Sequence, residues 1–176
     1  MRSSPASGSA AMYTTFLLAM AAAKKSIYIT NPYFVPEDKM VQTLLEARQR
    51  GVRIVLLLPG AIDHNIVRQA SRGELGPLLK AGVEIYEYQP ALLHSKTMVI
   101  DGICATVGST NLDPRSFGLN DELNLVVYND GVAAKLQKVF EQDLEQSRRI
   151  TYESWARRGI FDRFLEVLSV PLRDQL

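Results

Sequence analysis

An unbroken run of apolar residues, VRIVLLLP from Val52 to Pro59, constrains the fold more than any other part of the sequence. The run has the length of a strand, and continuous apolar character is typical of a strand covered on both faces of its sheet. Helical patterns precede and follow it, over residues 36–50 and 63–80. Strands that alternate with helices indicate an α/β domain, so we expect a mixed β-sheet flanked by helices on both faces.

The length and composition suit one globular domain. The chain has 176 residues, of which 47% are hydrophobic and 22% charged, values that exclude a disordered or collagen-like protein. Residues 1–11 are rich in Ser, Pro, Ala and Gly and are expected to be a disordered lead-in or a cut end. The folded unit is expected over residues 12–150, and residues 151–176 are expected to be a helical extension of the same domain.

Charge, cysteine content and apolar run lengths exclude several classes of function. The net charge of +1 disfavours a nucleic-acid partner, because polyanion binding depends on clustered Lys and Arg. The single Cys104 forms no internal disulfide, and with only two histidines the chain offers no zinc set, so neither a metal nor a cofactor is expected. The apolar run from Phe16 to Ala23 is too short to cross a bilayer, and the chain is expected to be soluble.

Further strands and one more helix are expected along the rest of the chain. Residues 26–30 and 83–88 are strand-like, and two strands within residues 94–107 are predicted to meet in a hairpin turn at Asp101-Gly102, a dipeptide that tolerates positive φ. A strand over residues 122–129 and an amphipathic helix over residues 132–144 follow.

Three neighbouring segments in the second half of the chain carry residues suited to phosphoryl chemistry. In a strand, residues two apart share a face, so His94 and Lys96 are expected to point the same way, as are Ser109 and Asn111. Glu122 begins the next strand. An imidazole nitrogen of His94 could attack phosphorus, while Lys96, Ser109 and Asn111 stabilise charge on the phosphate oxygens. Glu122 is expected to accept a hydrogen bond from the other ring nitrogen of His94.

Two other positions leave alternatives open. Asp101 lies five residues after Lys96, so in a regular strand it faces away from the site; it either shapes the turn and anchors a neighbouring strand or takes a direct chemical part. Tyr33 and Phe34 in the loop NPYFVP either belong to a rigid loop or form a wall of the substrate pocket near a lipid's glycerol or acyl region.

A family resemblance rests on these same residues. HSKTMVID fits the HxKxxxxD pattern of the phospholipase D superfamily through His94, Lys96 and Asp101, and VGSTN resembles the downstream GSxN through Ser109 and Asn111. The segments NPYFVPED, RGVRIVLLLPG and GSTNLDPRSFGLNDELN extend the likeness to the C-terminal catalytic repeat of bacterial cardiolipin synthases, from about Met12 to Trp155.

The resemblance implies a phospholipase D-like half and a transferase of phospholipid biosynthesis that joins two phosphatidylglycerols, releases glycerol and passes through a phosphohistidine. It also implies that Asp101 belongs to the catalytic motif with His94 and Lys96, to which Glu122 is added through its expected bond to His94. In the family two such motifs share one site, whereas this chain has one, because His64 has no lysine two residues later. A C-terminal fragment, with Met1 as an added start, is therefore expected.

The resemblance implies partners and a location as well. The second repeat is expected from a missing N-terminal half or from a second copy of the chain, at the bacterial cytoplasmic membrane on which the whole protein would act. Two alternatives remain: a homodimeric phosphodiesterase acting on nucleic acid, and a fragment that binds a partner without being active alone.

Overall fold

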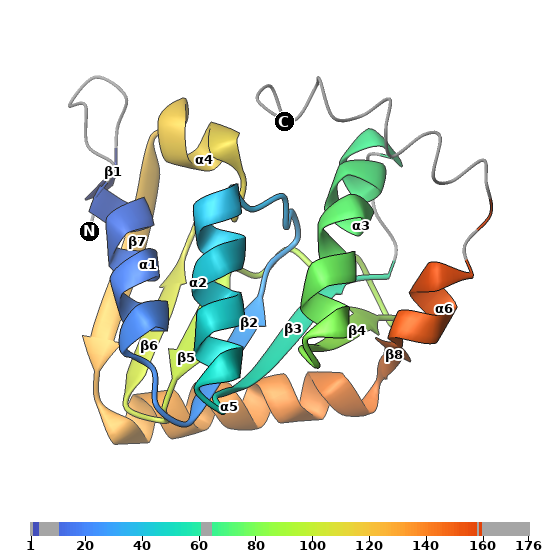
Figure 1. Cartoon of the computed structure of the whole chain (residues 1–176). Coiled ribbons are helices and arrows are strands. Elements are labelled where there is room, and N and C mark those ends of the chain that lie inside the picture. Colours follow the sequence, from blue (N-terminus) through green and yellow to red (C-terminus); the bar gives the residue numbers. More distant parts are fainter. Residues whose placement is uncertain (1, 4–10, 61–64, 158, 160–176) are drawn as a thin grey trace.

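Eight strands form one mixed sheet in the computed structural model, which describes residues 2–3, 11–60, 65–157 and 159 (Figure 1). β2, β3 and β4 run parallel to one another, and the remaining neighbours are antiparallel. This confirms the expected mixed α/β sheet. In order across the sheet the strands are β1 (Arg2–Ser3), β7 (Glu122–Tyr128), β6 (Cys104–Gly108), β5 (Thr97–Ile100), β2 (Ser26–Thr30), β3 (Arg53–Pro59), β4 (Glu84–Tyr88) and β8 (Ser147–Ile150).

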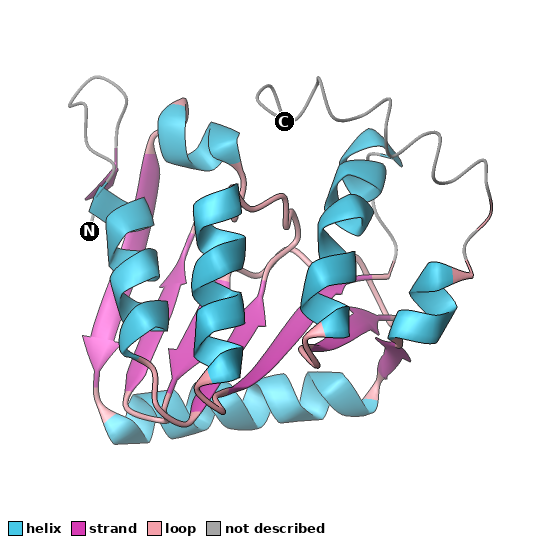
Figure 2. Cartoon of the chain, viewed as in Figure 1, coloured by secondary structure: helices cyan, strands magenta, loops and turns pink. Residues whose placement is uncertain are grey.

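Helices cover both faces of the sheet, as Figure 2 shows. On one face lie α1 (Ala11–Ala22), α2 (Asp38–Gln49) and α3 (Asn65–Lys80), whose side chains share a buried cluster with the sheet. On the other face α5 (Asp130–Glu145) runs across the strands and supplies Ala133 and Phe140 to a second cluster. Two short helices, α4 (Pro114–Gly118) and α6 (Tyr152–Ala156), lie nearer the rim.

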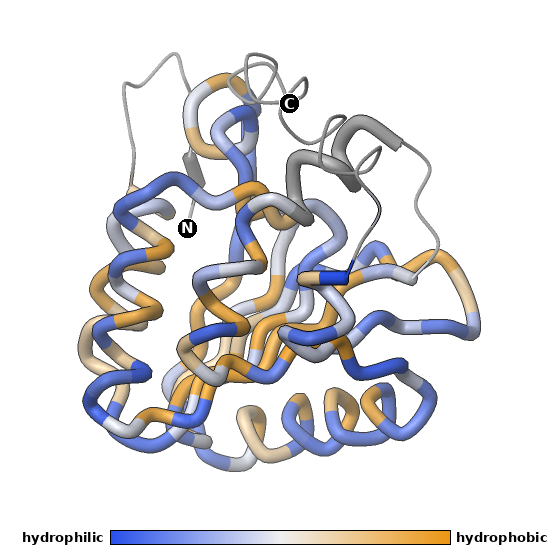
Figure 3. Tube along the Cα trace, turned by 45° about the vertical axis from the view of Figure 1, so that its right-hand side comes forward, coloured by the Kyte–Doolittle hydropathy of each residue, from blue (hydrophilic) through white to orange (hydrophobic). Residues whose placement is uncertain are grey.

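The apolar run that predicted a doubly covered strand becomes β3. Ile54, Leu56 and Leu58 belong to the cluster beneath α1, α2 and α3. Val55 and Leu57 alternate with them and pack in the cluster beneath α5. Both faces of β3 are therefore buried, and the hydrophobic colour in Figure 3 is concentrated along the central strands.

The predicted hairpin is present, but its first strand is shorter than expected. Asp101 and Gly102 both have positive φ, 54° and 70°, in the turn between β5 and β6. β5 begins only at Thr97. His94 and Lys96 therefore lie in the segment that leads into the strand rather than within it.

Other elements were missed or fall partly outside the described residues. The predicted lead-in contains β1, which pairs with β7, and neither β8 nor α4 was expected from the sequence. Of the predicted extension over residues 151–176, the structure describes α6 and the positions up to 157 together with 159. His64 lies outside the described residues. Within them, no helix combines the length and the apolar character that crossing a bilayer requires.

Candidate active site

The histidine and lysine of the motif lie side by side ahead of β5. The imidazole of His94 is exposed to solvent, whereas Lys96 is half-buried. Lys96 Nζ donates a hydrogen bond of 2.9 Å to the backbone carbonyl of His94, which brings the ammonium against the histidine's own peptide unit. The backbone carbonyl of Lys96 in turn accepts from Gly108 N at 3.2 Å, which ties this segment to the end of β6.

Two carboxylates stand close enough to Lys96 to influence its charge. Burial lowers the pKa of Lys96, and the negative charges of Glu122 and Asp113 raise it in part. Both carboxylates are themselves buried. The half-buried ammonium of Lys96 therefore lies within the electrostatic reach of two buried carboxylates.

Glu122 bonds to residues other than the one expected. Its carboxylate accepts from Ser109 Oγ and from Asn120 Nδ2, the latter at 3.3 Å. In the described part of the chain it makes no hydrogen bond to His94, so that predicted contact is wrong for this structure. The reason is the strand order: β6 lies between β5 and β7, and the start of β7 therefore meets Ser109 rather than the segment of His94.

The GSTN segment places its residues on alternate sides of the chain. Ser109 is exposed and Thr110 is buried. Ser109 Oγ also accepts from Leu123 N at 3.0 Å. Asn111 donates its side-chain amide to Asp113, while its Oδ1 is buried and has no partner among the described residues. A buried acceptor without a partner is costly, and its presence beside charged groups is typical of a site that receives a ligand.

Asp113 is a site residue that the sequence reasoning treated only as part of a turn. Its carboxylate caps α4 by accepting from Ser116 N at 2.6 Å. Burial raises the pKa of Asp113, while hydrogen bonds from Ser116 and Asn111 oppose the rise. An Asp directly before Pro114 is a recognisable pattern for the start of a helix, and this signal could have identified the residue.

Asp101 lies away from the other motif residues and anchors a neighbouring strand. Its carboxylate accepts from three consecutive backbone N–H groups, Lys24 at 2.9 Å, Lys25 at 2.7 Å and Ser26 at 2.9 Å. Burial pushes the pKa of Asp101 up, but these bonds outweigh burial and leave the pKa below its usual value. These bonds favour the structural alternative, and a direct chemical part for Asp101 stays a prediction.

The two aromatic residues of the NPYF loop have different positions. The Tyr33 ring meets the His94 ring edge-on, with centroids 6.1 Å apart and planes at 82°. Phe34 is 1% exposed and packs in the core beneath α1 and α2. The prediction of a pocket wall is therefore wrong for Phe34, since its ring cannot reach a substrate, and it remains a prediction for Tyr33.

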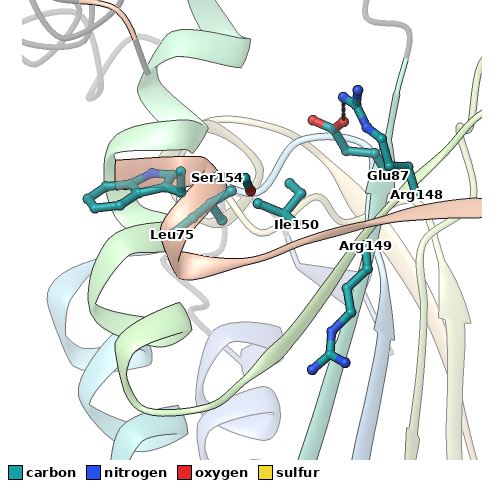
Figure 4. Close-up of a pocket in the computed structure, with 7 residues that line it drawn as sticks. Leu75, Glu87, Arg148, Arg149, Ile150 and Ser154 are labelled. Atoms are coloured by element: carbon teal, nitrogen blue, oxygen red, sulfur yellow. Dashed lines mark hydrogen bonds and ion pairs between the residues drawn. The ribbon is translucent and has the colours of Figure 1, made fainter. Parts of the chain in front are cut away.

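A hollow at the far side of the sheet carries no such chemistry. It lies between α3, β4, β8 and α6 and is lined by Leu75, Ile150 and Trp155 among others, and Figure 4 shows Leu75 and Ile150 at it. Its buried carboxylate, Glu87, is ion-paired with Arg148, as the dashed line in Figure 4 marks. Across the described ranges no cluster of three or more His, Cys, Asp or Glu side chains could hold a metal ion.

Comparison with protein families decides the assignment. Residues 17–144 match the family described as "Cardiolipin synthase, PLD-like domain". The chain belongs to this family. All the residues of the HxKxxxxD and GSxN patterns lie inside the matched range.

Curated relatives extend the match over most of the chain. Cardiolipin synthase 2 of Staphylococcus epidermidis is 40% identical over 154 residues, which are 88% of this chain and 32% of the relative. Cardiolipin synthase A of Erwinia tasmaniensis is 39% identical over 157 residues, 89% of this chain and 32% of the relative. The chain thus spans about a third of the length of these relatives.

Solved structures share the fold at low sequence identity. Nuc, a phospholipase D family member from Salmonella typhimurium, superposes with a TM-score of 0.72 at 20% identity, over 79% of this chain and 90% of Nuc. Phosphatidylserine synthase of Haemophilus influenzae gives a TM-score of 0.78 at 13% identity, over 94% of this chain and 45% of that one. These likenesses support the fold.

Proposed function

We propose that the chain is a catalytic half of a cardiolipin synthase-type phosphatidyltransferase. The observation that carries the proposal is the exposed His94 imidazole together with a half-buried Lys96 ammonium that bonds the His94 backbone carbonyl, in a chain of the cardiolipin synthase PLD-like family. A neutral imidazole is a nucleophile, and a neighbouring ammonium favours the charge that gathers on the phosphate in the transition state.

The reaction divides into two displacements at phosphorus. A ring nitrogen of His94 attacks the phosphorus of phosphatidylglycerol, the N–P bond forms, and the P–O bond to glycerol breaks. The departing glycerol oxygen takes a proton from a general acid. The hydroxyl of a second phosphatidylglycerol then attacks the phosphohistidine and gives its proton back to the same group, which regenerates His94 and yields cardiolipin.

The remaining polar groups have roles that follow from their contacts. Lys96 is assigned to the phosphate oxygens, and the charge of Glu122 adds to the field at Lys96. The Ser109 hydroxyl donates its one proton to Glu122 in this structure, so it can stabilise a phosphate oxygen only if that proton turns from Glu122 to the substrate. Asn111 remains in the substrate site, but its unpartnered atom is an acceptor. That buried acceptor cannot stabilise phosphate oxygens, so a phosphate role for Asn111 falls to its Nδ2, of which one N–H already bonds to Asp113.

The general acid must come from outside this chain's single motif. We assign it to the histidine of a second HxKxxxxD repeat, supplied by another part of the whole protein or by a second copy. An exposed apolar patch supports such a partner: Val107, Leu123 and Leu125 are 43%, 66% and 63% exposed. They lie on adjacent positions of β6 and β7, on the sheet face that α5 also covers. The whole protein would then act at a membrane surface.

The test is turnover of phosphatidylglycerol by the chain, alone and mixed with a separately expressed first repeat. His94→Ala and Lys96→Ala should each abolish transfer by the active assembly, and acid-quenched samples of the unaltered protein should contain a phospho-adduct on His94. Lys80→Ala, at an exposed lysine that ends α3, is the matched control and should transfer normally. Undiminished transfer by either site variant would overturn these roles. Salt-sensitive retention on DNA with cleavage would instead favour a nuclease.

A further inference from the structure

The amide side chain of Asn31 lies between two sides of the candidate active site. Asn31 directly follows β2 and is 3% exposed. Its backbone N–H donates to Leu57 O at 3.2 Å, so the residue continues the pairing of β2 with β3. The position of its side chain is therefore set by the centre of the sheet, the most rigid part of the fold.

One amide makes three hydrogen bonds to two different loops. Asn31 Oδ1 accepts from Tyr33 N at 3.2 Å and from Leu112 N at 3.2 Å. Asn31 Nδ2 donates to the carbonyl of Thr110 at 3.4 Å. The loop after β2 and the loop after β6 are thus held to the same side chain.

Each of these loops carries part of the proposed chemistry. Thr110 and Leu112 flank Asn111 in the chain, and Ser109 precedes Thr110. The bonds of Asn31 to the Thr110 carbonyl and the Leu112 N–H fix the backbone on both sides of Asn111. They therefore restrict the directions of the Asn111 and Ser109 side chains. On the other side, the backbone of Tyr33 is fixed, and its ring meets His94 edge-on.

A second buried amide supports the same loop from the opposite direction. Asn124 Nδ2 donates to Thr110 Oγ1, and both residues are buried. Lys96, Asn31, Thr110 and Asn124 line one small cavity beneath the site. Asn31 therefore lies at the same cavity as the lysine of the motif.

We propose that Asn31 is a positioning residue that sets the distance between the His94 side and the Ser109–Asn111 side of the site. The expected effect on turnover rests on the proposed function. The expected effect on phosphate binding does not depend on the proposed function. Asn31 Oδ1 accepts from the buried N–H of Leu112 and the part-buried N–H of Tyr33, so an apolar replacement would leave both donors without this partner.

Three variants separate positioning from general stability. Asn31→Leu has a similar volume and removes both acceptor bonds. Asn31→Asp keeps an oxygen for both N–H groups and loses only the 3.4 Å donor bond. Thr43→Val is the matched control, because Thr43 is also buried and its hydroxyl bonds to Lys39 O within α2, away from the site.

In the active assembly, Asn31→Leu should lower kcat by about 10–100-fold while KM changes by less than about threefold, since misplaced groups lose transition-state contacts. Asn31→Asp should restore most of kcat, and Thr43→Val should leave it unchanged. By NMR, hydrogen exchange of the Tyr33 and Leu112 amides should accelerate in Asn31→Leu alone. Inorganic phosphate, titrated against the Ser109 and Asn111 amide signals, should bind the same variant at least about tenfold more weakly.

The outcomes distinguish the two proposals. If the unaltered assembly shows no transfer but phosphate still binds and Asn31→Leu weakens it, the proposed function fails and the role of Asn31 stands. A folded Asn31→Leu with unchanged kcat and phosphate affinity overturns the role of Asn31, as does an unaltered chain that binds no phosphate and transfers nothing. Should Asn31→Leu not fold, Asn31→Ser, whose hydroxyl is too short for both N–H groups, must give the same loss.

Discussion

At the scale of single residues, Asp101 belongs to the HxKxxxxD sequence motif, but in the structure its side chain bonds to backbone groups. Its carboxylate is bonded to three backbone N–H groups at the start of β2, and its φ of 54° places it in the left-handed region. Asn tolerates this backbone conformation nearly as well as Asp does, whereas Ala does not. Asp101→Asn therefore isolates the contribution of the charge.

We expect Asp101→Asn to lower the free energy of unfolding at pH 7 by about 1–2 kcal/mol, the range for hydrogen bonds to an ionised acceptor near the surface. The folded-state pKa of Asp101 is below its usual value, so its stabilisation is complete above the unfolded-state pKa and is lost as pH falls through the folded-state one. The gap between variant and unaltered chain should therefore close in acid. Urea unfolding across pH 2–7 measures it. A variant of normal stability that transfers no phosphatidyl group would mean that Asp101 acts in the chemistry.

The charge of Lys96 makes a second prediction at this scale. Burial lowers the pKa of Lys96, and Glu122 partly offsets the effect. Because transfer requires the ammonium form, the alkaline limb of the rate profile should lie below the range in which ordinary lysines titrate. Glu122→Gln removes the supporting charge, so it should move this limb to lower pH and reduce the maximal rate by about tenfold or more. The pH profile of transfer is the measurement, with Glu145→Gln, an exposed residue at the end of α5, as control. An unmoved limb would rule out the coupling.

Alternation along strands predicted part of the site and no more. It predicted that Asp101 either shapes the turn or anchors a neighbouring strand, and the bonds of Asp101 to Lys25 N and Ser26 N at the start of β2 agree with this, although Lys96 and Asp101 both lie just outside β5. It could not predict that Glu122 bonds Ser109 rather than His94, because that depends on which strands are neighbours. Nor could it distinguish Tyr33 from Phe34, since the loop's direction is set by its pairing with Leu112 on a distant segment.

At the scale of elements, β6 and β7 are held unusually close at Gly108. A Cβ at this position would overlap the side chain of Asn124 and would lie 2.5 Å from the backbone oxygen of Leu123. Since part of the obstacle is backbone, the two strands would have to separate. The same movement would weaken the hydrogen bond from Asn124 to Thr110, and this bond holds the loop that carries Ser109 and Asn111.

Gly108→Ala should consequently lower the free energy of unfolding by about 1–3 kcal/mol, as overpacking of a close contact does, and should also reduce transfer. Gly73→Ala in α3 is its control, because a Cβ there meets nothing within 4 Å. The control should be neutral or more stable by up to about 1 kcal/mol through helix propensity. Thermal unfolding of both variants is the measurement. Normal stability of Gly108→Ala would show that β6 and β7 can separate without loss of stability.

Elements with a local signal could be predicted, and those defined by distant partners could not. The apolar run of β3 and the Asp-Gly turn each carry their own signal within a few residues. The SRRI segment of β8 has almost no apolar character. It becomes a strand because β4 offers a free edge, where Ile150 pairs with Ile85 and Arg148 with Glu87.

At the scale of the whole molecule, the sheet face that α5 covers is only partly covered. Val99 and Ala105 pack with α5, while Val107, Leu123 and Leu125 remain exposed. Burying one such side chain completely contributes about 1.5–3 kcal/mol, so the three together favour association strongly. The proposed second half rests on this patch and on the single HxKxxxxD motif.

A double variant, Leu123→Gln with Leu125→Gln, should abolish this association without unfolding the chain, because both side chains already face solvent in the isolated chain. Analytical gel filtration should show a smaller particle than the unaltered chain or its mixture with the first repeat, and transfer should fall by at least about tenfold as the second motif is lost. Leu18→Gln is the control, since Leu18 is 65% exposed on α1, on the other face of the sheet. The opposite result would be association and transfer that persist in the double variant and are lost in Leu18→Gln. It would place the partner-binding surface on the α1 side of the sheet and contradict a second motif opposite His94.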